Sequence, residues 1–241
     1  MEFLTLLSYG DSGWGDELLL GLGVTLALAL ATFPIAVVLS FAVCWAKVSP
    51  YRPVRIAAQI HTTVFKTLPE ILTLLILYYQ SQALINWATD WIAPGARLSV
   101  SPFLAGLIAL SLVISAYGSE VVRAALNAIG KGQTEAAQSL GLSPCQTFRL
   151  VILPQMWRHA IPGFGNLWVI LLKDTSLVSI IALSDLVHIA TLAINTTREP
   201  FFFYLVIGAI YIALVAVSAW LQKGLERRAS KGFARVETGD A

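Results

Sequence analysis

The stretch LLLGLGVTLALALATFPIAVVLSFAVCWA, residues 18–46, decides the fold class of this chain, because it contains no charged residue. A helix needs about 20 apolar residues to cross the roughly 30 Å hydrocarbon layer of a membrane. A run of this length predicts a transmembrane helix, with Pro34 as a candidate kink.

The composition of the whole chain agrees with a membrane protein. Of its 241 residues, 57% are hydrophobic and only 12% are charged. Soluble domains are about 45–50% apolar and about 25% charged. The composition therefore excludes a soluble enzyme, a disordered chain and a nucleic-acid binder with a basic face.

Four further apolar runs follow, at residues 56–85, 103–119, 160–183 and 201–221. The second and fourth of the five runs are interrupted by ionisable residues, whereas the others are uncharged. A membrane-spanning helix satisfies its own backbone hydrogen bonds. We therefore expect an all-α integral membrane protein with five continuous transmembrane helices.

The basic residues predict the orientation of these helices. An excess of Lys and Arg marks the cytoplasmic side. Arg97 and Arg198 lie in segments on one side, Lys66 and Lys173 lie within spans, and the remaining 12 of the 16 basic residues fall on the other side. The N-terminus is expected outside and the C-terminus in the cytoplasm. Because the N-terminal segment is acidic, no cleavable signal is expected.

The segment between the third and fourth runs, about residues 124–159, is too long for a plain connector. It reads as a short helix, a stop at Gly141 and a second short helix that begins at Ser143-Pro144 and ends at Pro154. Ala136 and Ala137 leave a low-relief helix surface that another protein could approach closely.

This segment resembles the signature loop of ABC importer permeases. The resemblance rests on Glu135-Ala136-Ala137, Gly141 and Leu153-Pro154 with their spacing. It implies that these six residues belong to a coupling helix and its surroundings, which dock into a cleft of an ATPase subunit. The alternative is an ordinary helical linker. We expect one permease domain over residues 1–241, with the coupling loop at about 124–159.

The resemblance extends over nearly the whole chain, to the polar amino-acid permeases. Four stretches carry it: Ala116–Arg123, Lys66–Glu70, Lys173–Leu177 and Arg198–Phe201. Glu70 after the proline resembles the branch that moves histidine, arginine, lysine, ornithine or opines. The resemblance implies a bacterial inner-membrane importer with two permease chains, identical or paralogous, two ATPase chains and an external solute-binding protein.

Catalysis and cofactors are assigned to the partners by the same resemblance. The sequence lacks a G-x-x-x-x-G-K-[ST] loop, so ATP and Mg are expected on the ATPase subunits. The permease itself is expected to be non-catalytic, to bind no cofactor and to hold no metal, because Cys44 and Cys145 form no metal-ligand spacing.

Ionisable residues at membrane depth are the candidates for the substrate pathway. Asp174 and Glu70 are placed near the middle of the membrane by the rise of a straight helix. One hypothesis pairs Lys173 with Glu70 and leaves Asp174 to meet a cationic substrate group. Thr175 and Ser176 add hydroxyl groups, and Lys66 completes the set. The alternative is that these charges form only interhelical pairs.

A structural pair is expected near the cytoplasmic end, where Glu120 and Arg123 are i,i+3 neighbours on one helix. Three alternatives stay open for the function: an importer of neutral or acidic amino acids, a secondary transporter or ion pathway, and an assembly subunit without its own pathway.

Overall fold

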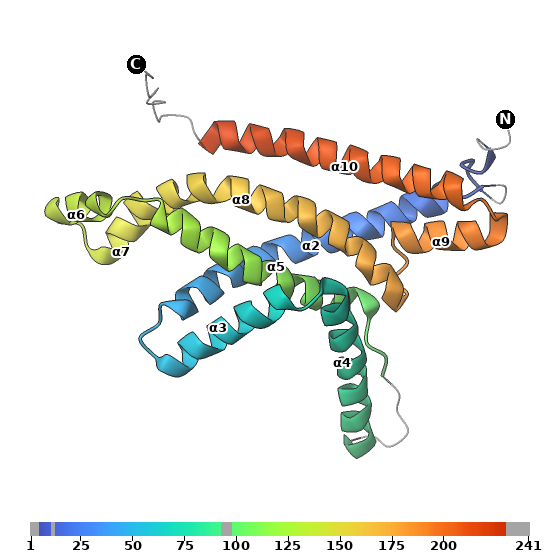
Figure 1. The fold of residues 1–241 in the computed structure, drawn as a ribbon, viewed down its shortest axis with the longest axis horizontal. Helices are drawn as coiled ribbons and strands as arrows, with labels where there is room; N and C mark the ends of the chain where they lie inside the picture. Colours follow the sequence, from blue (N-terminus) through green and yellow to red (C-terminus); the bar gives the residue numbers. More distant parts are fainter. Residues whose placement is uncertain (1–4, 11–12, 93–97, 230–241) are drawn as a thin grey trace.

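The computed structural model describes residues 5–10, 13–92 and 98–229, and in these residues every regular element is helical. Figure 1 shows long helices packed side by side, with the shorter helices at their ends. The all-helical class predicted from the sequence is confirmed. In chain order the main elements are α2 (Gly15–Lys47), α3 (Arg52–Thr67), α4 (Glu70–Ile92), α5 (Pro102–Asn127), α6 (Lys131–Ser139), α7 (Pro144–Thr147), η1 (Phe148–Ile152), α8 (Leu153–Asp174), η2 (Thr175–Ile181), α9 (Leu186–Thr197) and α10 (Pro200–Ala229).

Four helical runs in the described part are long and apolar enough to cross a membrane. They are α2, α5, the run Pro144–Ile181 from α7 through η2, and α10. Helices α3 and α4 meet the same requirement only together, and they are bent by 114° at the break between them. The structure thus contains four candidate spans, or five if the bent pair counts as one broken span.

The second span differs from its prediction as a continuous helix. Leu68 is extended, with φ −73° and ψ 138°, so α3 ends at Thr67 and α4 begins at Glu70. Pro69 explains the break, because it lacks an N–H and its ring disfavours a helical conformation in the residue before it. The placement of Glu70 along a straight helix is therefore wrong, and Glu70 lies at a bend.

The core lies where α2 packs lengthwise against α5, with α8 on the next side of α5. Small residues line the contact: Ala29, Ala36 and Ser40 of α2 and Ala109, Ala116 and Ser119 of α5 are all buried. A Cβ on Gly118 would collide with the Ser40 side chain. Small residues let helix backbones approach closely in a membrane, where dispersion contacts replace the hydrophobic driving force.

The fourth apolar run begins earlier than predicted and changes type near its end. Helix α8 starts at Leu153, and the chain tightens into the 3₁₀ helix η2 after Asp174. Asp185 then caps α9 by accepting a hydrogen bond from the His188 N–H at 3.0 Å. Within the described residues, α10 packs against α8 and α9.

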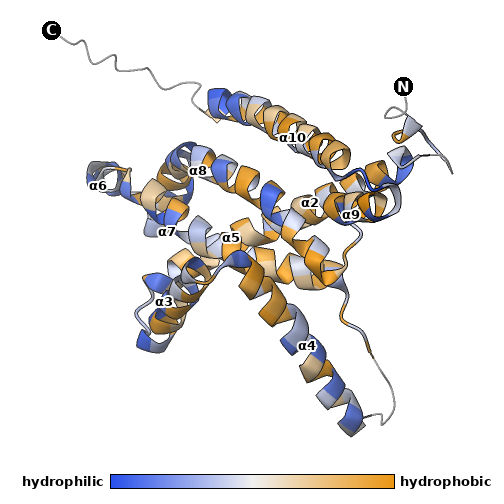
Figure 2. Ribbon diagram, turned by 45° about the vertical axis from the view of Figure 1, so that its right-hand side comes forward, coloured by the Kyte–Doolittle hydropathy of each residue, from blue (hydrophilic) through white to orange (hydrophobic). Residues whose placement is uncertain are grey.

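Hydrophilic residues mark the ends of several helices (Figure 2). Figure 2 shows hydrophilic residues on α6, at the turn from α2 to α3 and over the last turns of α10. Three of the basic residues counted for the orientation, Arg97, Lys231 and Arg235, lie outside the described residues.

Candidate functional site

A first group of polar side chains surrounds the break between α3 and α4. Glu70, the first residue of α4, is half-buried. The N-terminus of a helix carries partial positive charge, which favours a carboxylate at this position. The break thus places a stabilised negative charge beside the core of the bundle.

Asp174 supplies a second carboxylate at the end of α8. The residue is half-buried, and within the described structure its buried Oδ2 atom has no hydrogen-bond partner. The negative charge of Glu70 and the positive charge of Lys173 both act on Asp174. Glu70 and Asp174 therefore lie close enough to repel each other, although they are 104 positions apart in the chain (174 − 70).

The hypothetical ion pair between Lys173 and Glu70 is absent from the described part of the chain. Its ion pairs within 4.0 Å are Lys47–Glu120 and Arg123–Glu120. Lys173 is exposed, whereas the neighbouring Asp174 is half-buried. The reason is helix geometry, because adjacent residues diverge by about 100° around the axis. Neither carboxylate therefore has an ion-pair partner within 4.0 Å in the described residues.

Tyr117 of α5 joins these groups, and sequence reasoning did not single it out as a site residue. The charges of Glu70 and Asp174 both act on its hydroxyl. The Lys66 ammonium lies 5.9 Å from the centre of its ring. A tyrosine in an otherwise uncharged stretch near small polar residues was the available signal. Tyr117 thus interacts both with a cation at the end of α3 and with two carboxylates.

Thr175 and Ser176 follow Asp174 in the chain, but both hydroxyl groups already donate their protons to backbone carbonyls. Thr175 donates to the Leu172 carbonyl at 2.7 Å, and Ser176 donates to the Lys173 carbonyl at 2.6 Å. The Ser176 oxygen can still accept a hydrogen bond from a ligand, whereas Thr175 is fully buried. The arrangement offers acceptors and negative charge, which suits a ligand rich in N–H donors.

A cleft lies between α3 and the ends of α2 and α5, and Lys66 is one of the residues that line it. Its volume is about 570 Å³. The lining is largely polar, and it comprises Lys47, Val48, Gln59, Thr62, Thr63, Lys66, Thr67, Glu120 and Arg123.

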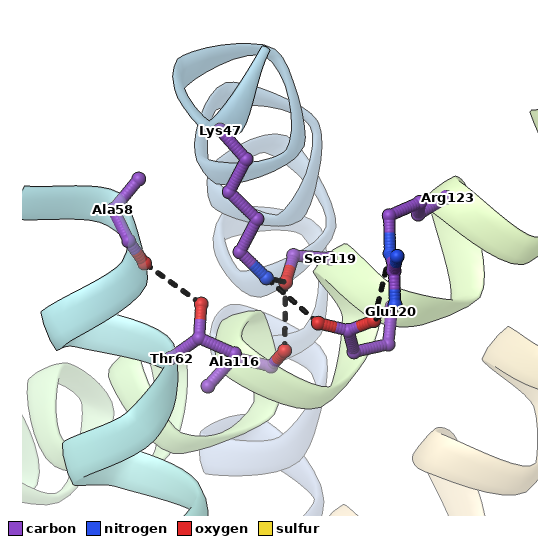
Figure 3. A network of polar contacts seen from close by, with 7 residues as sticks. All are labelled: Lys47, Ala58, Thr62, Ala116, Ser119, Glu120 and Arg123. Carbon is purple, nitrogen blue, oxygen red and sulfur yellow. Dashed lines mark hydrogen bonds and ion pairs between the residues drawn. The ribbon is translucent and has the colours of Figure 1, made fainter. Parts of the chain in front are cut away.

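A network of hydrogen bonds closes one wall of this cleft (Figure 3). Lys47 Nζ lies 2.9 Å from Ser119 Oγ and 2.8 Å from Glu120 Oε1. The other oxygen of Glu120 accepts from Arg123 at 2.6 Å, which is the i,i+3 contact predicted from the sequence. The contact with Lys47 was missed, because Lys47 entered the sequence argument only as a marker of orientation.

The 124–159 segment has the helix–stop–helix start that the sequence predicts. Gly141 has φ +82°, and the Leu142 and Gly141 N–H groups bond back to Ala137 and Gln138 of α6. This left-handed cap favours a residue without a Cβ, although Ala182 and Arg198 also adopt a positive φ at the ends of η2 and α9. Ser143 then caps α7 in a reciprocal capping box with Gln146.

Two details of this segment correct the sequence interpretation. Pro154 lies in the first turn of α8, directly after the π-helix η1, and does not end the helical run, which continues from Pro144 to Ile181. Ala136 is exposed as expected, but Ala137 is buried at 4% exposure, because α6 packs back on η1. Glu135 and Pro154 are exposed, and Leu153 is half-buried.

Two leucines of this segment are exposed and were not singled out from the sequence. Leu140 is 83% exposed and Leu150 is 62% exposed. Gln155 of α8 bonds to Gln133 of α6 at 3.2 Å, which fixes α6 against the start of α8. The segment therefore presents two exposed apolar side chains on short helices that are fixed against the start of α8.

These features define a polytopic helical membrane protein with a polar site inside it. The chain belongs to the family of binding-protein-dependent transport system inner membrane components, whose model matches residues 39–231. The family predicted from the sequence is confirmed.

Three comparisons with known proteins place the chain within that family. It is 40% identical over 223 residues to the arginine ABC transporter permease protein ArtQ of Escherichia coli, covering 88% of this chain and 93% of ArtQ. It is 34% identical over 235 residues to the octopine transport system permease protein OccQ of Rhizobium meliloti, covering 98% and 99%. A crystal structure of an amino acid ABC transporter with histidines matches with a TM-score of 0.78 at 30% identity, covering 89% of this chain and 95% of that one.

Proposed function

We propose that this chain is the permease subunit of an ATP-driven, binding-protein-dependent importer of polar, basic amino acids or opines. The observation that carries the basic preference is the pair of interacting carboxylates, Glu70 and Asp174, neither of which forms an ion pair within the described residues. The relatives named for arginine and octopine support the same substrate class.

The chemistry of the site follows from its charges. Two carboxylates that repel each other in a partly buried place are relieved by a cation. A guanidinium or ammonium group would bind between Glu70 and Asp174, and it would supply a partner for the buried Oδ2 atom of Asp174, which has none among the described residues. Lys173 and Lys66 limit the net negative charge, and Ser176 offers an acceptor oxygen, whereas Thr175 is buried. A neutral or acidic side chain would not compensate the two carboxylates.

The proposed orientation places the N-terminus outside and the C-terminus in the cytoplasm of a bacterial inner membrane. The distribution of 12 of the 16 basic residues supports it. One permease domain spans residues 1–241, and the 124–159 segment faces the cytoplasm. The external solute-binding protein then contacts the opposite end, near residues 87–101 and 185–199.

The ATPase partners dock on the 124–159 segment. Glu135, Ala136 and Gly141 lie on or after α6, and Leu140 adds an exposed apolar side chain next to them. Leu153 and Pro154 begin α8, so they connect the docking surface to a membrane-spanning helix, while Ala137 packs α6 inward. The two ATPase subunits hold ATP and Mg, and the permease binds no cofactor.

A second permease chain packs against α4. Figures 1 and 2 show α4 extending away from the other helices. It packs on α5 and η2, and its exposed side chains include Ile71, Ile76 and Leu84. A partner chain there would enclose the pathway that Glu70 and Asp174 border on one side.

Alternating access is the mechanism that this arrangement supports. The 124–159 segment directly joins α5, which carries Tyr117, to α8, which carries Asp174. Movement of the docked ATPase subunits would therefore change the packing of both helices at the site. Closure of the ATPase pair opens the pathway outward, and ATP hydrolysis returns it to the inward-open form.

Uptake by the assembled importer in proteoliposomes tests the proposal. We expect uptake of arginine that requires ATP and the solute-binding protein, and that persists when a protonophore removes the proton gradient. Uptake driven by the proton gradient without ATP would identify a secondary transporter. ATP-dependent uptake of glutamine or glutamate without arginine would refute the basic preference.

A further inference from the structure

The cleft between α3 and the ends of α2 and α5 carries surplus positive charge. Three basic residues line it, Lys47, Lys66 and Arg123, against the single acidic residue Glu120. Both oxygens of Glu120 are already bonded, one to Lys47 and one to Arg123. Lys66 forms no ion pair within the described residues. The cleft therefore suits an anionic group.

Hydrogen-bond donors remain available around this charge. An ammonium has three donors, and Lys47 uses two of them, on Ser119 and Glu120. A guanidinium has five donors, and Arg123 uses its Nε and one Nη2 donor on Glu120. Charged donors bind carboxylate or phosphate oxygens about twice as strongly as neutral ones. A carboxylate would accept hydrogen bonds from the remaining donors of Lys47 and Lys66.

The position of the cleft connects it to the proposed substrate site. One lining residue, Lys66, has its ammonium 5.9 Å from the centre of the Tyr117 ring. The charges of Glu70 and Asp174 act on the hydroxyl of that ring. The cleft also reaches Lys47 and Arg123, near the start of the 124–159 segment. A volume of about 570 Å³ accommodates an amino acid together with waters of about 30 Å³ each. The cleft thus lies between Lys66 and the proposed cytoplasmic side.

We propose that this cleft is an exit site that binds the α-carboxylate of the transported amino acid through Lys66 and Lys47. The inference rests on the proposed importer function and orientation. It does not rest on the basic preference, because every α-amino acid carries the same carboxylate. A substrate that has left Glu70 and Asp174 is held there before release, and cytoplasmic amino acid occupies the same site and slows the cycle.

The test uses the complete importer in proteoliposomes with the ATPase subunits facing the outer medium and loaded solute-binding protein trapped inside. ATP hydrolysis is measured while arginine, its α-amide or inorganic phosphate is added outside. We expect arginine to inhibit, and its α-amide to need a concentration about tenfold higher, which corresponds to the loss of one charge-assisted contact. Inorganic phosphate keeps the anionic charge but lacks the rest of the amino acid, so it should inhibit more weakly than arginine.

Variants separate a binding role from a structural one. Lys66→Met should raise the half-inhibitory concentration of arginine about tenfold, and Lys66→Arg should keep inhibition because it keeps the charge. Lys223→Met is the matched control, because Lys223 is an exposed lysine of α10 outside the cleft, and it should leave inhibition unchanged. Each inhibition curve is normalised to the variant's own uninhibited rate.

Equal inhibition by arginine and its α-amide would overturn the proposal, and so would phosphate that inhibits as strongly as arginine. The proposal would also be overturned if arginine did not inhibit the unaltered importer, or if Lys66→Met left the inhibition curve unchanged. If the proposed importer function itself is wrong, the assembled complex will show no arginine uptake, which is a different result. If uptake assays identify another amino acid, the same comparison is made with that amino acid and its α-amide.

Discussion

Lys47, the last residue of α2, binds Glu120 of α5 with 2.8 Å between Nζ and Oε1, across 73 positions of the chain. The same carboxylate holds Arg123 with its other oxygen, one turn before the end of α5. One side chain thus ties the end of α2 to the helix that enters the 124–159 segment. A movement of that segment would act on α2 through this contact.

A double-mutant cycle with Lys47→Met and Glu120→Gln tests the strength of this tie. The Lys47 side chain is 12% exposed, so we expect a coupling energy of about 1–3 kcal/mol, larger than for a surface pair. Thermal unfolding midpoints of the purified complex, taken at one scan rate, provide the measurement. Arg123→Met is the control, because its side chain is 58% exposed and should contribute about 0.5 kcal/mol. Additive effects of the two variants would contradict the prediction.

Substituting the paired carboxylates should change selectivity. Asp174→Asn and Glu70→Gln each remove one charge, so arginine uptake should fall about tenfold or more, while uptake of a neutral amino acid falls less. Initial uptake rates at saturating binding protein give the ratio. Asp90→Asn provides the control, because Asp90 is an exposed carboxylate at the far end of α4. An unchanged ratio in Asp174→Asn would remove Asp174 from the pathway.

The left-handed cap at Gly141 predicts a position-specific effect of an added methyl group. Gly141→Ala forces a Cβ at φ +82°, which costs about 1 kcal/mol and disturbs the end of α6. ATP hydrolysis should then respond less to the loaded binding protein. Gly132→Ala is the matched control, since Gly132 lies within α6 with open space around it and should be neutral or slightly stabilising. The same loss in both variants would argue against a role for the cap.

The buried cap of α9 predicts a pH dependence of stability. Burial raises the pKa of the Asp185 carboxyl to about 6 from an ordinary 3.8, and its Oδ2 atom has no hydrogen-bond partner in the described structure. The folded state therefore holds a proton that the unfolded chain releases. Stability falls as the pH rises from about 4 to about 6, by up to about 3 kcal/mol, and stays lower above that range.

Asp185→Asn isolates this contribution, because asparagine caps a helix as well as aspartate does. The variant should unfold at a higher temperature than the unaltered chain at pH 8 and show a smaller difference at pH 5. Thermal midpoints at the two pH values provide the measurement. A variant that is less stable at pH 8 would show that the charged carboxylate contributes a favourable contact.

Local features of the chain could be predicted because they depend on neighbouring residues. Uncharged runs long enough to cross a membrane indicated α2, α5 and α10, and the structure contains them. The stop at Gly141 and the capping box of Ser143 follow from the conformations that glycine and serine favour. The Glu120–Arg123 contact spans three residues of one helix.

Other predictions failed where a local signal allowed two outcomes. A proline can end a helix or lie in its first turn, so Pro154 was expected to end the second short helix, whereas it lies in the first turn of α8. A proline within an apolar run can kink a helix, as expected of Pro34, or break it, as at Pro69. Pro34 lies inside the continuous α2, whereas Pro69 follows an extended Leu68.

The sequence by itself determined that the chain is a helical membrane protein of the permease family, because apolar length and motif spacing are properties of contiguous residues. Only the tertiary structure brought Glu70 and Asp174 together beside Tyr117 and placed Lys47 on Glu120. Those contacts join helices far apart in the chain, and their geometry depends on the 114° bend after α3 and on the close packing of α2 against α5.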